Sequence, residues 1–319
     1  VALFALSANA DLQQELDNLA PGSSFELPPE TLSSLAIRVP GVSVSCAPET
    51  VIDGAGQGNA VEILAERITF SGCQVRNWGK DLNELDAGIF LAREAQGAVV
   101  ENNRLQGPAF GVWLDATPDA TVRDNHIRGD TSLRSQDRGN GIHLFNTTGA
   151  LIEGNDISQT RDAIYIETAN RNTIRGNVMS DLRYGIHYMY SMHNLLENNV
   201  TRGTRTGYAL MQSKYLKVFN NRSENDENYG ILMNFITNSE LRNNVVTGVS
   251  QGQSAGVVIS GAEGKAVFIY NSLYNTFEGN YFGHSNIGIH LTAGSEENQV
   301  FNNAFVENQR QVKYVATRT

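Results

Sequence analysis

The sequence predicts an all-β fold, a right-handed parallel β-helix in which each coil of the chain stacks on the one before. Three observations predict it. Asparagine recurs at a nearly constant interval, glycine recurs at the same interval, and each glycine is followed by alternating apolar and polar residues. Two separate columns with one period indicate a solenoid, for which we expect roughly ten coils of 22–23 residues with loop insertions.

The asparagine column marks one bend of each coil. Each member follows a Gly, Asn or Asp, and the column consists of Asn103, Asn125, Asn155, Asn177, Asn199, Asn221, Asn244, Asn280 and Asn303. Asparagine and glycine tolerate the left-handed backbone that a tight bend requires. Stacked asparagine side chains can also hydrogen-bond from coil to coil, as amide ladders do in cross-β stacks.

The second column precedes a short strand in each coil. It consists of Gly88, Gly111, Gly141, Ala163, Gly185, Gly207, Gly230, Gly256 and Gly288. In the strands that follow, apolar residues alternate with others, so one set points into the core and the other points out. Leucine-rich and helical repeats need regular leucines or helix-period spacing, and both are absent here.

The ends of the chain differ from the repeats. In residues 1–10, Ala8-Asn9-Ala10 fits a signal-peptidase site, so we expect the remnant of a secretory signal. The alternative is a short apolar strand or helix packed on the solenoid end. Residues 11–319 are predicted to form one β-helix domain that begins with a capping helix at 11–19. No such cover follows the last repeat, and we expect a truncated tail or a cap supplied elsewhere.

The composition limits the partners of this protein. The chain has 24 Lys and Arg against 34 Asp and Glu, a net charge of −10, and it has no basic block. Nucleic acid and anionic membrane surfaces are therefore disfavoured. No apolar run approaches the ~20 residues of a membrane span. Cys46 and Cys73 lie about one coil apart, and the sequence leaves open a disulfide or two buried free thiols.

Outward positions in the middle of the chain carry side chains that suit a ligand or a partner. They are Trp113, His143, Phe145, Tyr165, Glu167, His187, Met189 and Met211. Adjacent coils place Met189 beside Met211, with His187 on the same face, and Met192 and His193 follow in the next bend. Thioethers and imidazoles favour Cu(I).

Two functional hypotheses follow from this set. In the first, Met189, Met211 and His187 bind Cu(I) transiently, with Met192 and His193 as auxiliary ligands. In the second, the surface is a metal-free docking face that includes Trp113, His143, Phe145 and Tyr165.

An enzyme is the less favoured prediction. β-Helices that cut or epimerise acidic polysaccharides need clustered carboxylates near the sugar. Residues 184–191 stand where similar C5-epimerases of uronic-acid polymers carry an acidic, His-containing strand, but Tyr188, Met189 and Tyr190 replace the acidic residues. We therefore predict a non-catalytic protein and keep carbohydrate binding, or epimerase or lyase activity, as the alternative.

Gly185-Ile-His-Tyr-Met-Tyr-Ser191 and Gly207-Tyr-Ala-Leu-Met-Gln-Ser213 resemble the NosD family of accessory proteins for nitrous-oxide reductase maturation. The resemblance extends from about residue 35 to the end of the chain. It implies a periplasmic β-helix that helps to assemble the copper–sulfur centre of the reductase, with copper or sulfur as the cargo. It implies as partners an ABC-type permease with its cytoplasmic ATPase, the reductase, and a copper-chaperone lipoprotein. Gln212 departs from the family, in which we expect an aromatic, and the chain ends where relatives continue.

Overall fold

The computed structural model describes residues 11–251 and 263–315. The described residues contain 36 short strands that recur in sets of three, so the chain makes about twelve turns where the sequence predicted roughly ten. The predicted right-handed parallel β-helix is confirmed. The chain divides into two compact units, Val1–Arg161 and Asp162–Thr319, each described below by itself.

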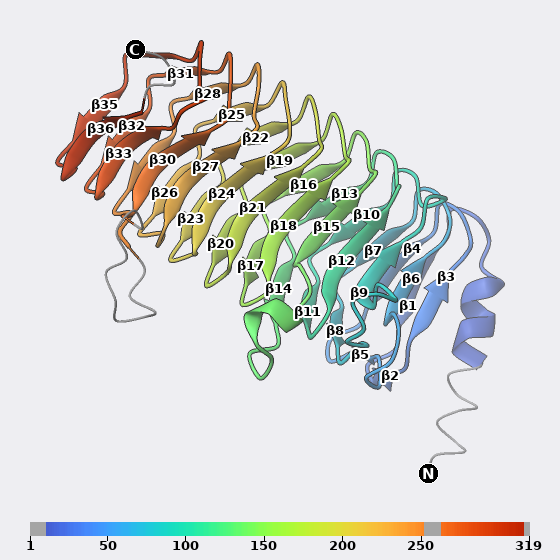
Figure 1. The fold of residues 1–319 in the computed structure, drawn as a ribbon. Coiled ribbons are helices and arrows are strands. Elements are labelled where there is room, and N and C mark those ends of the chain that lie inside the picture. The colour runs from blue at the N-terminus through green and yellow to red at the C-terminus, as the bar shows by residue number, and fades with distance from the viewer. Residues whose placement is uncertain (1–10, 252–262, 316–319) are drawn as a thin grey trace. The chain divides into compact units, whose positions relative to one another are not determined.

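The first unit stacks its turns so that their strands form three parallel sheets (Figure 1). Sheet A contains β1 (Ser24–Leu27), β4 (Ser43–Cys46), β7 (Thr69–Ser71), β10 (Val99–Glu101), β13 (Thr121–Arg123) and β16 (Leu151–Glu153). Sheet B contains β2 (Thr31–Leu32), β5 (Val51–Asp53), β8 (Gln74–Arg76), β11 (Arg104–Gly107), β14 (His126–Gly129) and β17 (Asp156–Ser158). Sheet C contains β3 (Leu35–Ile37), β6 (Val61–Ile63), β9 (Ala87–Leu91), β12 (Phe110–Asp115) and β15 (Ile142–Phe145).

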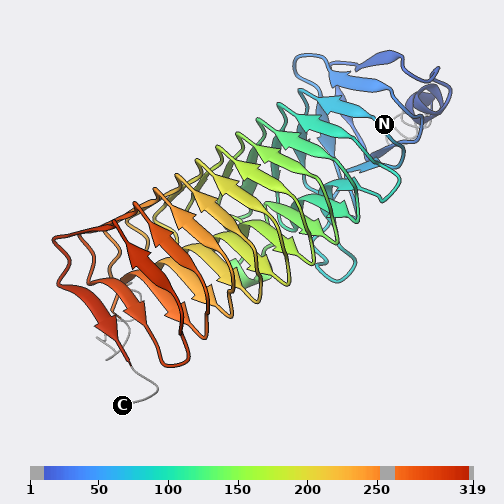
Figure 2. The same ribbon diagram turned by 90° about the horizontal axis from the view of Figure 1, so that it is seen from above.

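The second unit repeats this plan, and Figure 2 shows its strands in ordered rows. Its sheet A contains β19 (Thr173–Arg175), β22 (Leu195–Glu197), β25 (Lys217–Phe219), β28 (Glu240–Arg242), β31 (Thr276–Glu278) and β34 (Gln299–Phe301). Its sheet B contains β20 (Val178–Ser180), β23 (Val200–Arg202), β26 (Arg222–Glu224), β29 (Val245–Thr247), β32 (Tyr281–Gly283) and β35 (Ala304–Val306). Its sheet C contains β18 (Asp162–Glu167), β21 (Tyr184–Met189), β24 (Thr206–Met211), β27 (Tyr229–Asn234), β30 (Lys265–Tyr270), β33 (Ile287–Leu291) and β36 (Arg310–Tyr314).

The glycine column lies where adjacent turns approach closely. A Cβ atom at Gly185 would stand 2.4 Å from the Thr201 side chain and 2.5 Å from the Gly207 carbonyl oxygen, so only glycine fits there. One assignment in this column is corrected by the strand register. Lys265 pairs with Ile287 and Val267 pairs with Ile289, so Ala266 aligns with Gly288 and holds the column position in this turn. Gly256, assigned to it from sequence spacing, lies outside the described residues.

The asparagine column forms the predicted amide ladder within each unit. Asn221 is representative and is 1% exposed. Its Oδ1 accepts hydrogen bonds from the backbone N–H and the Nδ2 of Asn199, at 3.0 and 2.9 Å. Its own N–H and Nδ2 donate to Oδ1 of Asn244, at 2.9 and 3.1 Å. Each buried amide is thus satisfied by the turns on either side.

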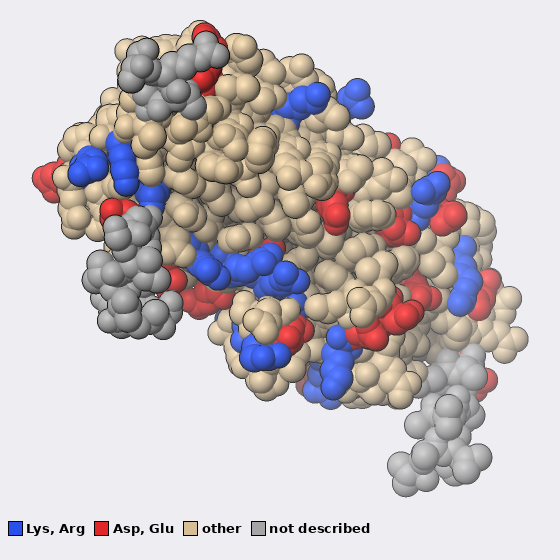
Figure 3. Space-filling model, viewed as in Figure 1, with Lys and Arg blue, Asp and Glu red and all other residues tan. Residues whose placement is uncertain are grey.

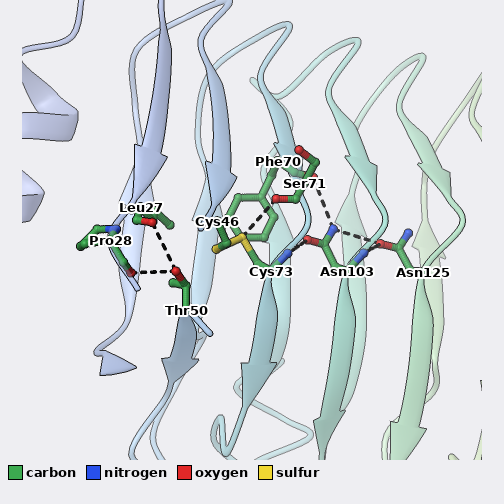
Figure 4. The surroundings of a disulfide bond; sticks show 9 residues. All are labelled: Leu27, Pro28, Cys46, Thr50, Phe70, Ser71, Cys73, Asn103 and Asn125. Carbon is green, nitrogen blue, oxygen red and sulfur yellow. Dashed lines mark hydrogen bonds between the residues drawn. A yellow bond between two sulfur atoms is a disulfide. The ribbon is translucent and has the colours of Figure 1, made fainter. Parts of the chain in front are cut away.

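Cys46 and Cys73 form a disulfide, which resolves the alternative that the sequence left open. Figure 4 shows that the bond lies beside the ladder of the first unit. The backbone N–H of Cys73 donates to Oδ1 of Asn103, whose own side chain bonds to Asn125. The disulfide therefore occupies the position that precedes the first asparagine of this ladder.

Replacing both cysteines with serine is expected to lower the free energy of unfolding by about 2–4 kcal/mol, because the bond closes a loop and so restricts the unfolded chain. Urea denaturation of the oxidised protein and the variant measures the difference. A reducing agent is the control, since it should destabilise the wild type and leave the variant unchanged. Equal stability of oxidised wild type and variant would contradict the prediction.

The predicted capping helix is present at residues 11–17. Leu16, on this helix, is buried at 1% exposure. The side-chain amide of Gln13 pairs with the backbone of Ala36 in β3, donating at 2.8 Å and accepting at 2.9 Å, which covers part of the sheet edge. The expected signal remnant, residues 1–10, lies outside the described residues. Within the described chain, no helix has the length and apolar character needed to cross a membrane.

Candidate functional site

Two methionines lie next to each other on the outer face of sheet C in the second unit. β21 and β24 are parallel neighbours, and their register aligns Met189 with Met211. Tyr188, between His187 and Met189, is fully buried in the core, so Met189 points outward. Both methionines are half-buried, and the region over these strands is mostly uncharged in Figure 3. The predicted placement of Met189 beside Met211 on adjacent turns is confirmed, and their role as ligands stays a prediction.

His187 lies two residues before Met189 on the same face of β21. Its ring is buried, and Nδ1 is 3.0 Å from Oδ2 of Asp162. An ionised carboxylate only accepts hydrogen bonds, so Nδ1 carries the proton. In the neutral ring Nε2 then carries the lone pair, and this atom is buried with no hydrogen-bond partner among the described residues. An imidazole oriented by a carboxylate in this way presents a free nitrogen to a metal ion.

Asp162, the first residue of β18, is held by Arg183 as well as by His187. Arg183 donates from Nε to Oδ1 at 2.8 Å and from Nη2 to Oδ2 at 2.6 Å. Burial by itself raises the pKa of Asp162, but the hydrogen bonds from His187 and Arg183 lower the pKa below its ordinary value. The carboxyl group is thus ionised at neutral pH and can fix the tautomer of the imidazole.

Sequence reasoning missed Asp162 and Arg183. The strand register could have revealed them. Asp162, the first residue of β18, pairs with Tyr184, the first residue of β21, and Arg183 directly precedes Tyr184. The outward positions that carry His187, Met189 and Met211 lie later in these strands.

Two tyrosines enclose the imidazole of His187. Tyr165 stacks on it, with ring centroids 4.3 Å apart and planes at 14°. Tyr184 approaches edge-on, with centroids 5.0 Å apart. The ring is left only 8% exposed. Because little water reaches it, electrostatic interactions at Nε2 are stronger than they would be in bulk solvent.

Met192 and His193 belong to a different column, in the bend after β21. Met192 is half-buried and pairs with Lys214 across the turns. His193 is exposed, and its ring stacks on Tyr215 with centroids 4.8 Å apart. Among the described residues, no group of three or more His, Cys, Asp or Glu side chains is arranged to hold a metal ion. A metal on β21 and β24 would therefore rest on thioethers and one imidazole.

Comparison with known proteins gives the family of this chain. A family model described as "Periplasmic copper-binding protein (NosD)" matches residues 123–319. The chain belongs to the NosD family. This confirms the resemblance that the two methionine-bearing strands indicated.

Two curated NosD relatives are similar to most of the chain, and each is named "Probable ABC transporter binding protein NosD". The relative from Pseudomonas aeruginosa is 60% identical over 273 residues, which cover 86% of this chain and 64% of the relative. The relative from Stutzerimonas stutzeri is 54% identical over 279 residues, covering 87% and 64%. The chain thus spans about 64% of the length of these NosD proteins.

Solved structures share the β-helix of this NosD-family chain at low sequence identity. The Streptococcus pneumoniae surface adhesin PfbA superposes with a TM-score of 0.77 at 10% identity, over 97% of this chain and 90% of the adhesin. The A-module of the Azotobacter vinelandii mannuronan C-5 epimerase AlgE6 gives 0.71 at 13% identity, over 98% and 93%. At these identities the similarity shows the fold alone.

The predicted docking face of the NosD-family chain is partly covered. Trp113 and His143 point outward from β12 and β15, but they are only 5% and 4% exposed. Their predicted exposure is wrong, because the rings pack on each other at 4.1 Å and Leu82 and Leu85 pack against the cluster that contains Trp113. The two leucines belong to the insertion after Trp78, which folds back over sheet C of the first unit.

The other two docking-face residues differ from each other. Phe145 is 38% exposed, as predicted. Tyr165 is half-buried, since one face of its ring is stacked on His187. Of the predicted docking residues in the first unit of this NosD-family chain, Phe145 is therefore the exposed one. Tyr165 packs on the imidazole of His187 and is part of that site.

Proposed function

We propose that this chain holds Cu(I) transiently at Nε2 of His187 and the thioethers of Met189 and Met211. The metal is cargo, received and released for the copper–sulfur centre of nitrous-oxide reductase. Two thioethers and a neutral imidazole are soft ligands that suit Cu(I). None of these three ligands carries a charge, so the ion is held less tightly and can be released.

The observation that carries the proposal is the free Nε2 of His187. This nitrogen is buried and has no partner among residues 11–251 and 263–315, and the Asp162 carboxylate orients it on the face that carries Met189 and Met211. A buried polar atom with no partner is costly unless a ligand satisfies it. The family description, with its mention of copper, supports the same ligand.

The remaining parts of the proposed role come from the family. The description as periplasmic supports delivery in that compartment. The names of the relatives support association with an ABC-type permease and its cytoplasmic ATPase. A copper-chaperone lipoprotein would supply the ion, and the reductase would receive it. We propose a non-catalytic role, since Asp162, the carboxylate nearest the imidazole, is held in an ion pair with Arg183.

An anaerobic Cu(I) titration against a competing chelator tests the site. The wild type is expected to bind close to one equivalent, and His187→Ala/Met189→Ala/Met211→Ala is expected to bind at least about tenfold more weakly. Met179→Leu is the matched control, because Met179 is fully buried in the core and its loss should leave the affinity unchanged. Met192→Leu/His193→Asn tests the auxiliary ligands, for which we expect a smaller loss.

Two results would contradict the proposal. Folded wild type that binds no Cu(I) would remove the isolated site and favour a metal-free docking role. Equal binding by the triple variant would place the metal elsewhere in the chain.

A further inference from the structure

The bend between sheets C and A of the second unit carries two columns of side chains at its surface. The strand register places Tyr190, Gln212, Phe235 and Asn271 in the first column, one from each successive turn. Parallel bridges join Met192, Lys214, Thr237 and Leu273 from turn to turn, so the residues that directly follow these four are aligned as well and form the second column. Its members are the next residues along the chain, His193, Tyr215, Asn238 and Tyr274.

From Tyr190 in the first column and from Tyr215 in the second, aromatic and amide side chains alternate. In the first column Tyr190 and Phe235, which are 53% and 49% exposed, flank Gln212. In the second column Tyr215 and Tyr274, which are 43% and 59% exposed, flank Asn238. Successive strands lie ~4.8 Å apart, so in each column the two aromatic rings are separated by two turns, or ~9.6 Å.

The backbone at these positions is unfavourable for aromatic residues. Tyr190, Phe235, Tyr215 and Tyr274 have φ angles of 52°, 56°, 57° and 59°. Bulky residues in this left-handed region are strained, whereas asparagine and glycine are tolerated. The same two bend positions in the first unit hold the smaller residues Ala116, Asp119, Asn146 and Gly149. Positive φ recurs at these bends throughout the repeats, so what sets these four turns apart is that bulky aromatic residues are kept at exposed positions where asparagine and glycine fit with less strain.

We infer that this aromatic ridge, formed by Tyr190, Tyr215, Phe235 and Tyr274, binds an uncharged glycan of equatorially linked pyranose rings. Such a chain is extended, and its repeat of two rings has nearly the length of two turns. The C–H face of every second sugar can then stack on an aromatic ring while the glycan runs along the stacked turns.

The amides between the rings support a sugar ligand. The side chains of Gln212 and Asn238 are exposed and make no hydrogen bond to other described residues, so they are free to bond to sugar hydroxyls. No carboxylate lies between the four rings. The second column continues to Arg171 before His193 and to Glu297 after Tyr274, and Lys214 is the charged residue of the bridge row between the columns. The core of a protein–protein interface would instead be a continuous apolar surface with few polar groups.

The test is a calorimetric titration of the full chain with chitohexaose. The wild type is expected to bind, and Tyr215→Asn/Phe235→Asn/Tyr274→Asn is expected to bind at least tenfold more weakly. Because asparagine tolerates a positive φ, this variant should fold and melt at the wild-type temperature or above it. Tyr314→Asn is the matched control, since Tyr314 is 66% exposed on β36, away from the ridge, and its loss should not change binding.

Maltohexaose provides a control of shape, because its α-linkages curve the chain and remove the extended repeat. We expect it to bind at least tenfold more weakly than chitohexaose. The inference is overturned if the wild type does not bind chitohexaose, which would leave the ridge as a protein-binding surface. It is also overturned if the triple variant or maltohexaose binds equally well. His187, Met189 and Met211 are intact in the triple variant, so it should bind Cu(I) with no more loss than Met192→Leu/His193→Asn, because Tyr215 stacks on His193.

Discussion

Replacing Asn221 with alanine is expected to lower the free energy of unfolding by about 3–5 kcal/mol. The substitution removes the oxygen that accepts from the backbone N–H and Nδ2 of Asn199. Both donors are buried, and each unsatisfied donor costs ~1–3 kcal/mol. It also removes the bond that the side chain donates to Asn244. Urea denaturation followed by circular dichroism measures the loss.

The adjacent Asn220 provides the control. It is exposed with a φ of 56°, a conformation that glycine adopts without strain. Asn220→Gly is therefore expected to change stability by less than about 1 kcal/mol. If both variants lose the same stability, the bend conformation and not the amide ladder is the source of the effect.

Replacing Asp162 with alanine is expected to lower the free energy of unfolding by about 3–5 kcal/mol, because it breaks a buried ion pair and strands one charge. Asp162 is 1% exposed, and the guanidinium of Arg183 would lose both of its bonds to the carboxylate. His187 would also lose its orienting partner, so Cu(I) affinity should fall together with stability. Denaturation and the chelator titration measure the two effects on the same variant.

The stability difference between wild type and Asp162→Ala is expected to depend on pH. Because the pKa of Asp162 is lowered in the folded state, its contribution is complete well above the ordinary value of 3.8. It is lost as the pH falls below 3.8 toward the folded pKa. The difference should therefore be constant near neutral pH and shrink in acid. The exposed Asp181, replaced by asparagine, is the control and should change stability little at any pH.

The periodic part of the structure was predictable because each turn repeats the geometry of the last. The asparagine column places Asn221 beside Asn199, and counting outward positions places Met189 beside Met211. Both statements need only the period of the repeat and the alternation of a strand. For the same reason, the fold class was predictable from two columns of residues.

The non-periodic features were not predictable in this way. The insertion that carries Leu82 and Leu85 folds over Trp113, and no repeat dictates the direction in which a loop folds. The bond between His187 and Asp162 joins different columns on adjacent strands, so an alignment within one column does not reveal it. Spacing alone also could not decide between a disulfide and free thiols at Cys46 and Cys73.

The amide ladder has a direction, and this makes its two ends chemically different. Each asparagine donates its backbone N–H and Nδ2 to the oxygen of the asparagine one turn later, as Asn199 does to Asn221 and Asn221 does to Asn244. A newly formed turn therefore completes the one before it and leaves its own donors open. At its other end the ladder presents an open acceptor, so its two ends have different hydrogen-bonding needs.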